Sequence, residues 1–140
     1  MLPAGRVCFW VLMLAAAGFV AVTLNELPSP VATHFGGSGQ ANGWMSRGAY
    51  AGYLVAIGVL LPLVVVYLIS RRTGLQDASW WLGCLLVGFA LGLHALIRGA
   101  HHSQPPRLST SGFLTVLGLF IVGLVMWVRG ALRKPARRAP

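Results

Sequence analysis

Histidine, asparagine and tryptophan recur at binding sites, and this chain holds all three in one polar stretch, residues 27–47. His34, Asn42 and Trp44 lie inside the stretch and Arg47 closes it. A neutral imidazole can accept a hydrogen bond, take up a proton or bind a metal, so His34 is the leading candidate for chemistry. The spacing predicts a loop that binds a ligand through His34, Asn42, Trp44 and Arg47.

A second group of histidines follows later in the chain. His94 lies inside an apolar run, and Arg98 follows one helical turn later on the same face. Both are candidate ligand-binding residues, because ionisable groups within apolar segments are often functional. The alternatives are that His94 makes a polar contact between helices and that His34 hydrogen-bonds within its own loop.

A metal site is the weakest of these hypotheses. Zinc takes three or four ligands, commonly imidazole nitrogens. His34, His101 and His102 are weak candidates, with Glu26 as a further donor, but their spacing matches no metal motif. A haem would need two opposed ligands inside the helices, where only His94 lies, so no cofactor is expected.

Catalysis by paired carboxylates conflicts with the composition. The chain has only two acidic residues, Glu26 and Asp77, and the predicted topology places them on opposite sides of a membrane. Gly37-Ser38-Gly39 lacks the strand-to-helix setting of a nucleophile turn, and no Asp accompanies His34. We therefore expect a non-enzymatic protein, with a metal-dependent membrane enzyme as an alternative.

The composition indicates the medium in which these residues act. Of the 140 residues, 56% are hydrophobic and only 9% are charged, whereas about a quarter are charged in soluble domains. The net charge of +9 does not indicate nucleic acid, because the basic residues flank apolar runs as membrane topology requires. Lipid, rather than water or nucleic acid, is the expected surrounding.

Four uncharged runs are long enough for helices that cross a bilayer, which needs about 20 residues. The sequence predicts a single all-α integral membrane domain, 1–140, with helices at about 7–25, 48–70, 78–97 and 112–128. The outer loops are 26–47 and 98–111, and a basic tail spans 129–140. The first run exceeds a signal-peptide h-region and lacks a good cleavage site, so we expect it to be retained.

Lysine and arginine set the orientation of these helices. With both termini in the cytoplasm, eight basic residues lie inside and three lie outside, namely Arg47, Arg98 and Arg107. The tail is then placed to contact anionic lipid. Cys8 and Cys84 fall near cytoplasmic helix ends, where no disulfide is expected.

Small residues spaced by four predict close helix packing. One stripe is Gly48, Gly52 and Ala56, and another is Cys84, Gly88 and Gly92. We expect these stripes to make contacts within the chain rather than between copies. Pro62 should bend the second helix. The expected interfacial anchors are Tyr50, Tyr53, Trp80 and Trp81.

The polar stretch has its own local pattern. Residues 31–35 alternate like a strand, and Asn42-Gly43 is a strong tight-turn signal. We predict a compact loop or short irregular hairpin whose aromatic residues Phe35 and Trp44 dip toward the membrane surface and are its buried anchors. Its structural residues would be Pro28, Phe35, Gly39 and Gly43.

The same stretch resembles a signature of small bacterial membrane proteins of unknown function, shared with the SdpI-type immunity proteins. The signature reads Leu-Pro-x-x-Ile-Pro-Thr-His-Phe-Asn-x-x-Gly-x-Pro-Asp-Gly-Trp-x-Ser-Lys. The matching positions are Leu27, Pro28, Thr33, His34, Phe35, Gly39, Gly43, Trp44 and Ser46, with Arg47 for the lysine. The chain departs from it at Ala32, Gly36, Ala41 and Asn42.

This resemblance implies a bacterial inner-membrane protein that recognises something outside the membrane through residues 27–47. Immunity to a peptide toxin, or another protein partner outside, is what it suggests. The alternative is an accessory subunit of a transporter or sensor complex, whose glycine-rich faces dock other helices.

Overall fold

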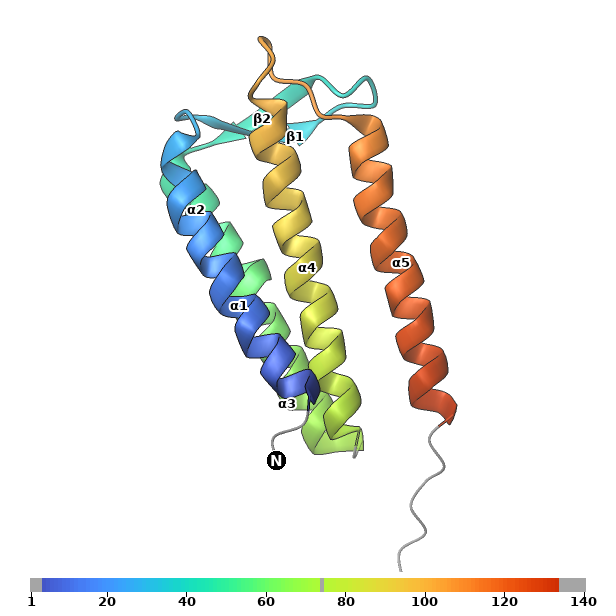
Figure 1. The fold of residues 1–140 in the computed structure, drawn as a ribbon. Helices are drawn as coiled ribbons and strands as arrows, with labels where there is room; N and C mark the ends of the chain where they lie inside the picture. Colours follow the sequence, from blue (N-terminus) through green and yellow to red (C-terminus); the bar gives the residue numbers. More distant parts are fainter. Residues whose placement is uncertain (1–3, 74, 134–140) are drawn as a thin grey trace, which may run out of the picture.

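A computed structural model describes residues 4–73 and 75–133. The first span is α1 (Ala4–Thr23), extended by the 3-10 turn η1 (Leu24–Glu26). The second is α2 (Arg47–Val55), the π-helical turn η2 (Ala56–Leu60) and α3 (Leu61–Thr73). The third and fourth are α4 (Gln76–Ala100) and α5 (Thr110–Arg133). Two strands, β1 (Val31–Phe35) and β2 (Ala41–Met45), cover one end of the helices (Figure 1).

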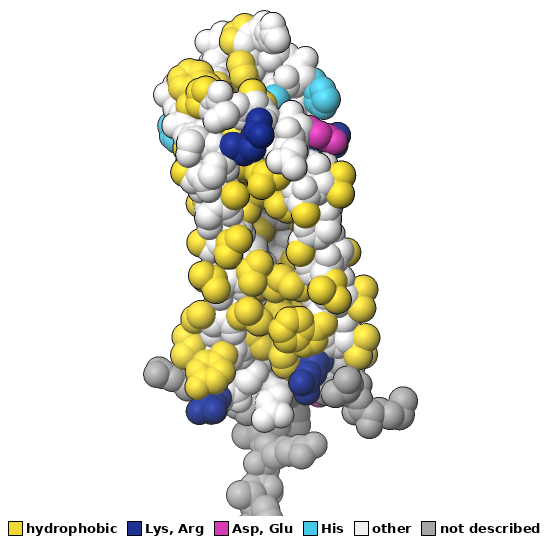
Figure 2. All heavy atoms as spheres, turned by 90° about the vertical axis from the view of Figure 1, so that its left-hand side faces the viewer, with side chains coloured by type: hydrophobic (Ala, Val, Ile, Leu, Met, Phe, Trp, Pro, Cys, Tyr) yellow, Lys and Arg dark blue, Asp and Glu magenta, His cyan; other side chains and the backbone are white. Residues whose placement is uncertain are grey.

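Four helices are long and apolar enough to cross a membrane, which confirms the predicted fold class. Figure 2 shows a belt of hydrophobic side chains between two ends, where the charged and histidine side chains gather. The described ends of the chain, in α1 and α5, lie at the same end of the bundle, opposite the strands. An even number of crossings produces this arrangement. The part of the tail at residues 134–140 lies outside the described residues.

The π-helical turn ends two residues before Pro62, and proline chemistry explains it. Proline has no N–H to donate to the carbonyl four residues earlier, and its ring clashes with that carbonyl. A π turn widens the helix at this point and relieves the clash. The predicted disturbance of the second span therefore takes the form of the π turn η2, and Pro62 itself is fully buried.

Side chains from three spans form two separate cores. At the strand-free end, Phe9 and Met13 of α1 pack with Val66 of α3 and Val87 of α4. Trp80 joins this cluster, where its ring centroid lies 5.4 Å from that of Phe9. At the other end, a second cluster joins helix and hairpin through Leu27, Val31, Tyr50 and Leu54. This second cluster fixes the hairpin on the bundle.

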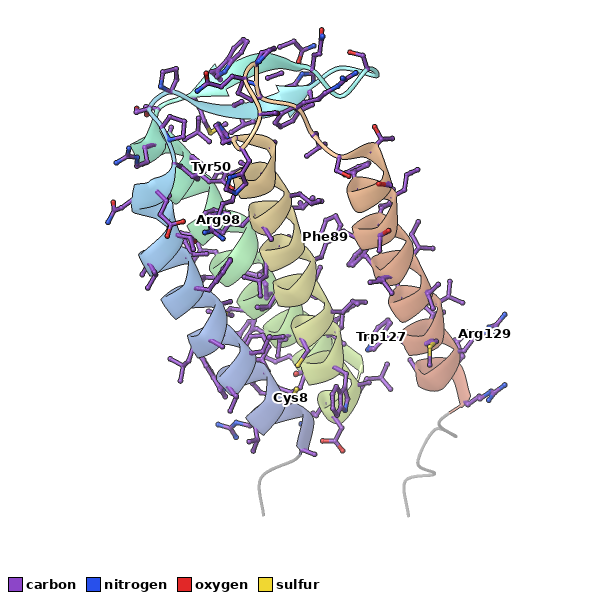
Figure 3. All side chains as sticks on the ribbon, turned by 45° about the horizontal axis from the view of Figure 1, so that its top comes forward. Cys8, Tyr50, Phe89, Arg98, Trp127 and Arg129 are labelled. Carbon is purple, nitrogen blue, oxygen red and sulfur yellow. The ribbon has the colours of Figure 1, made fainter. Side chains whose placement is uncertain are left out.

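Helix α5 stands apart from this core, and among the described helices it packs chiefly on α4. None of its side chains is fully buried. Its contacts with α4 include the Phe89–Phe120 ring pair, with centroids 4.5 Å apart, and a 2.6 Å hydrogen bond from Trp127 Nε1 to the Ala78 carbonyl (Figure 3). Gly123 lets Leu85 approach, because a Cβ there would lie 2.6 Å from the Leu85 side chain.

Several packing predictions are corrected. The stripe Gly48, Gly52 and Ala56 is exposed, and a Cβ at either glycine would meet no neighbouring atom, so it makes no helix contact within the described chain. In the other stripe only one of the two glycines makes a helix contact. Gly92 lies against Val116, whereas Gly88 faces open space.

Two of the four predicted interfacial anchors are instead inside the protein. Tyr50 is fully buried, and Trp80 is half-buried in the core at the strand-free end. Tyr53 and Trp81 are exposed, as predicted. Sequence spacing cannot decide which of two nearby aromatic residues faces lipid. Cys8 and Cys84 are both free thiols, and the Cys84 thiol lies 3.9 Å from the Gly5 carbonyl oxygen.

Candidate functional site

The polar stretch forms a two-stranded antiparallel hairpin. Its turn spans residues 36–40, closed by hydrogen bonds from Gly36 N to Gln40 O and from Gly39 N to Gly36 O. The predicted tight turn at Asn42-Gly43 is wrong, because both residues lie inside strand β2. Gly43 instead pairs with His34 at a register shift in the ladder. Gly39 takes the left-handed conformation, with φ of 79°, that the actual turn requires.

His34, Asn42 and Gly43 form one structural unit on the exposed surface of this hairpin. The Asn42 side-chain oxygen accepts a 2.5 Å hydrogen bond from His34 Nδ1. The bond places the proton on Nδ1 and leaves Nε2 as an exposed acceptor. A Cβ at Gly43 would lie 2.9 Å from His34 Cβ, so only glycine fits opposite the imidazole. The alternative that His34 hydrogen-bonds within its loop is confirmed.

The connection between α4 and α5 holds the hairpin from the other side. His101 Nδ1 donates to the Ile97 carbonyl at 2.8 Å, and its Nε2 accepts from the Ala32 backbone N–H at 3.1 Å. Leu108 N donates to Gly39 O at 2.8 Å, and the Arg107 guanidinium lies 3.4 Å from the Ser38 carbonyl oxygen. An isolated two-stranded hairpin is marginally stable, so these bonds explain its order.

This use of His101 removes it from the metal hypothesis, since both ring nitrogens are engaged. Glu26 is likewise occupied by an ion pair with Arg98 at 2.7 Å. His102 is exposed. Among the described residues, no three side chains of His, Cys, Asp or Glu come together to hold a metal ion.

The predicted anchors of the loop differ in their surroundings. Phe35 is half-buried, whereas Trp44 is 53% exposed, so the expectation that Trp44 is a buried anchor is wrong. Pro28 is also exposed. The residues that hold the hairpin are instead Val31 and Ala32, both fully buried.

Arg47 begins α2 directly after Ser46, whose hydroxyl caps the helix by accepting from Ala49 N at 3.1 Å. The Arg47 Nε atom is buried and makes no hydrogen bond with the described residues. Neither Arg47 nor Arg98 lines the cavity described below. The predicted site residues therefore fall into separate groups rather than one site.

Beneath the hairpin, His94 joins three helices. Its Nε2 lies 2.8 Å from the Thr23 hydroxyl of α1, and its Nδ1 lies 2.9 Å from the Tyr50 hydroxyl of α2. Thr23 also donates to the Phe19 carbonyl at 2.7 Å. Because that bond uses the only Thr23 proton, His94 Nε2–H must donate to Thr23 and Tyr50 must donate to Nδ1. The predicted alternative of a polar contact between helices is thus confirmed for His94.

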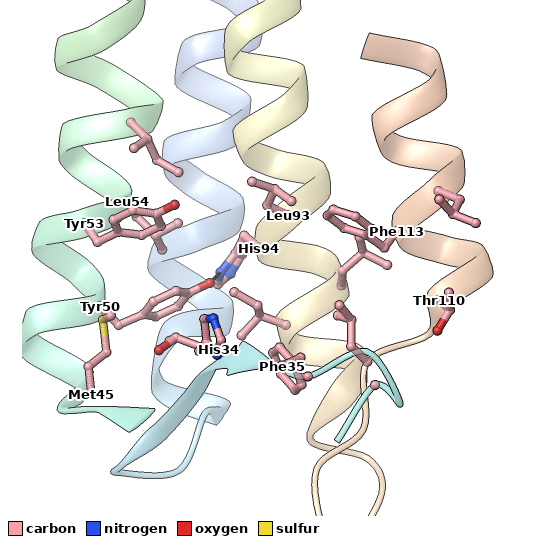
Figure 4. A pocket seen from close by; sticks show the side chains of 18 of the residues that line it. His34, Phe35, Met45, Tyr50, Tyr53, Leu54, Leu93, His94, Thr110 and Phe113 are labelled. Carbon is pink, nitrogen blue, oxygen red and sulfur yellow. Dashed lines mark hydrogen bonds between the residues drawn. The ribbon is translucent and has the colours of Figure 1, made fainter. Parts of the chain in front are cut away.

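A cavity of about 690 Å³ lies between this cluster, the hairpin and α5. Figure 4 shows Tyr50 and Tyr53 on one side, Leu93 and His94 at the back and Phe113 on the side of α5. Hairpin residues Thr33 to Gly37 line its remaining wall, with Gly39 and Met45. The predicted residues His34, Phe35, Gly39 and His94 meet here, whereas Asn42 and Trp44 do not line it.

Thr23 and Tyr50 were not among the predicted site residues. The only signal for Thr23 is a hydroxyl residue near the end of an otherwise apolar run. Such a residue ordinarily bonds to its own helix, as Thr23 also does through Phe19. Its link to His94, 71 residues away, depends on how the helices pack.

Comparisons with known proteins identify a domain without an assigned activity. Residues 11–64 match the family described as a domain of unknown function, DUF1648. The match covers most of α1, the hairpin, α2, η2 and the start of α3. No curated protein and no solved structure matches the chain.

Proposed function

We propose that this protein is a non-enzymatic receptor of the bacterial inner membrane that recognises an extracytoplasmic partner through its hairpin, residues 27–47. The carrying observation is the exposed His34, held in one orientation by Asn42 on a hairpin that is itself bonded to the α4–α5 connection. A fixed acceptor on a rigid surface loses little conformational entropy on binding. The exposed Trp44 adds an aromatic contact of the kind enriched at binding surfaces.

A peptide partner is the favoured occupant of this surface. The resemblance of residues 27–47 to the SdpI-type immunity proteins suggests protection against a secreted toxin peptide. Asn42 stands where that signature has an acid, yet its carbonyl oxygen still orients His34. The exposed acceptor His34 Nε2 would then bind an N–H or O–H donor of the peptide.

The experiment compares two identical substitutions at exposed histidines. Native membranes containing the wild-type protein, His34→Gln or His102→Gln are incubated with the peptides secreted by the same cells, and bound peptides are identified by mass spectrometry. We expect His34→Gln to lose the bound peptide and His102→Gln to retain it. Equal capture by all three proteins would contradict recognition through His34.

A second candidate function is an accessory subunit, and one observation favours it. The exposed stripe Gly48, Gly52 and Ala56 makes no helix contact within the described chain. Small residues at this spacing permit close approach of another helix in lipid. Co-purification of a partner membrane protein that Gly52→Ile abolishes, while His34→Gln does not, would favour this function over peptide recognition.

A further inference from the structure

We propose that the cavity beneath the hairpin binds an uncharged single-chain lipid, with its polar head at the hairpin and its hydrocarbon chain between α2 and α5. This site lies beneath the hairpin surface proposed above and shares His34 with it, and it is carried by the cavity's size, lining, charge and opening. Its volume of about 690 Å³ falls within the 300–1,000 Å³ typical of small-ligand sites.

The lining changes character with depth. Away from the hairpin most of the lining is hydrocarbon, including Ile57, Leu93 and Leu114. The polar groups there are the Tyr53 hydroxyl and the pair Tyr50–His94, whose polar atoms bond to each other. At the hairpin end the lining residues include the polar residues Thr33, Thr110 and His34. Neither threonine hydroxyl has a hydrogen-bond partner among the described residues, so both are available to a ligand. A molecule with one polar end and one apolar end matches this lining.

The charges exclude an ionised head group. Among the described residues, no Asp, Glu, Lys or Arg lines the cavity. The nearby Arg98 is paired with Glu26, and the Arg107 guanidinium lies against the Ser38 carbonyl. An ionised head would lose hydration here without gaining an opposite charge, which is costly. A hydroxyl or ester head needs only the hydrogen bonds that the two threonines supply.

The cavity opens sideways toward the surroundings of the helices. Tyr53 of α2 and Leu114 of α5 both line it, and both side chains are exposed. They lie in candidate membrane spans, so lipid is the medium at this opening. The hairpin turn fills little of this space at Gly37, which lines the cavity, carries no side chain and has open space where a Cβ would lie. A lipid can therefore enter directly from the bilayer.

The test uses a photoreactive monoacylglycerol, with a diazirine in its chain, added to the full-length protein in phosphatidylcholine nanodiscs. We expect light-induced labelling of residues 93–97 and 110–114 that excess unlabelled monoacylglycerol abolishes. A probe with the same chain and a phosphate head should label about tenfold less. Unsaturable labelling spread over all lipid-facing helices, or equal labelling by the phosphate probe, would overturn the proposal.

Two variants locate the site. Leu93→Trp fills the cavity and should lower labelling about tenfold, whereas Leu14→Trp, exposed on α1 away from the cavity, should not. Thr33→Val keeps the side-chain volume and removes the hydroxyl. It should weaken labelling by the monoacylglycerol while leaving labelling by a headless diazirine alkane unchanged. If Leu93→Trp does not fold, the Thr33→Val comparison decides alone, and equal effects on both probes would refute the predicted head contact.

Discussion

At the scale of single residues, His94 determines how three helices meet below the hairpin. Among the described residues, the buried polar side chains are Thr23, Ser79 and His94. In the chain of hydrogen bonds Tyr50–His94–Thr23–Phe19, each hydroxyl or ring hydrogen has one acceptor available. The imidazole is therefore neutral, with its proton on Nε2. A protonated His94 would have to donate to Tyr50, and the tyrosine proton would then lose its acceptor. The cluster is therefore a structural link between spans.

Removing the Tyr50 hydroxyl tests this link. Tyr50→Phe leaves His94 Nδ1 buried without a donor, which should lower the free energy of unfolding by about 1 kcal/mol, in the range measured for hydrogen bonds between membrane helices. Thermal unfolding in detergent measures the change. Tyr53→Phe is the matched control, because the Tyr53 hydroxyl is exposed and makes no hydrogen bond with the described residues. In a double-mutant cycle with Thr23→Val, the two losses should be less than additive.

The glycines of the hairpin permit an equally direct comparison. Gly39→Ala should disorder the turn, because φ at Gly39 is 79° and a Cβ would lie 2.7 Å from the Leu108 carbonyl oxygen. Gly37→Ala should have little effect, since open space surrounds that position. Limited proteolysis of residues 36–40 reports the difference. Equal cleavage of the two variants would show that the bond from Leu108 to Gly39 does not hold the turn.

Prediction of single residues from the sequence succeeded where a residue type is rare in its surroundings. It failed where the hydrogen-bond partners lie far away along the chain. His94 was recognised as a candidate because ionisable groups are rare in apolar runs. Its partners were not, because Thr23 and Tyr50 lie 71 and 44 residues away. Trp44 was assigned as an anchor from its type alone, whereas the pairing of β1 with β2 leaves it exposed.

At the scale of elements, α5 depends on its contact with α4. Gly123→Val should separate the two helices, because Leu85 occupies the space that the new side chain needs. Gly118→Val is the control, since a Cβ there meets no neighbouring atom. The readout is disulfide formation between cysteines placed at Phe89 and Phe120, after Cys8 and Cys84 are replaced by serine. We expect Gly123→Val to reduce this cross-link and Gly118→Val to leave it unchanged.

The spans were predictable because hydropathy and length are properties of a continuous run of residues. The hairpin turn was not. Asn-Gly is the strongest short turn signal, but the register shift at Gly43 places this pair inside a strand. Position 43 needs a glycine because its backbone lies close to His34. In the sequence, a glycine required by such a contact looks the same as a glycine required by a turn. The π turn before Pro62 was foreseen only as a bend.

At the scale of the whole molecule, α1 is required by both cores. It supplies Phe9 and Met13 to one core, its Val20 packs against the other, and its Thr23 bonds to His94. We therefore expect the first span to remain in the mature protein, and intact mass spectrometry measures this directly. A product that begins near residue 22 or 24 would contradict the prediction, and it would leave His94 without its Thr23 partner.

The distribution of charge over the molecule predicts its orientation. The hairpin end of the helices carries Arg47 at the start of α2, Arg98 in the last turn of α4 and Arg107 in the α4–α5 connection. By sequence, the other eight basic residues fall at the opposite ends of the spans or in the tail. Basic residues are retained on the cytoplasmic side during insertion, so the hairpin should face outward and both termini inward. Reporter fusions at Pro140 and Ser38 should therefore score inside and outside, respectively. Added lysines beside the hairpin should weaken this preference, because they reduce the charge difference between the two ends. An outside score for the Pro140 fusion would mean that the orientation is inverted or that one helix does not cross, and the Ser38 fusion distinguishes these results, because an inside score at Ser38 would place the hairpin surface out of reach of an extracytoplasmic partner.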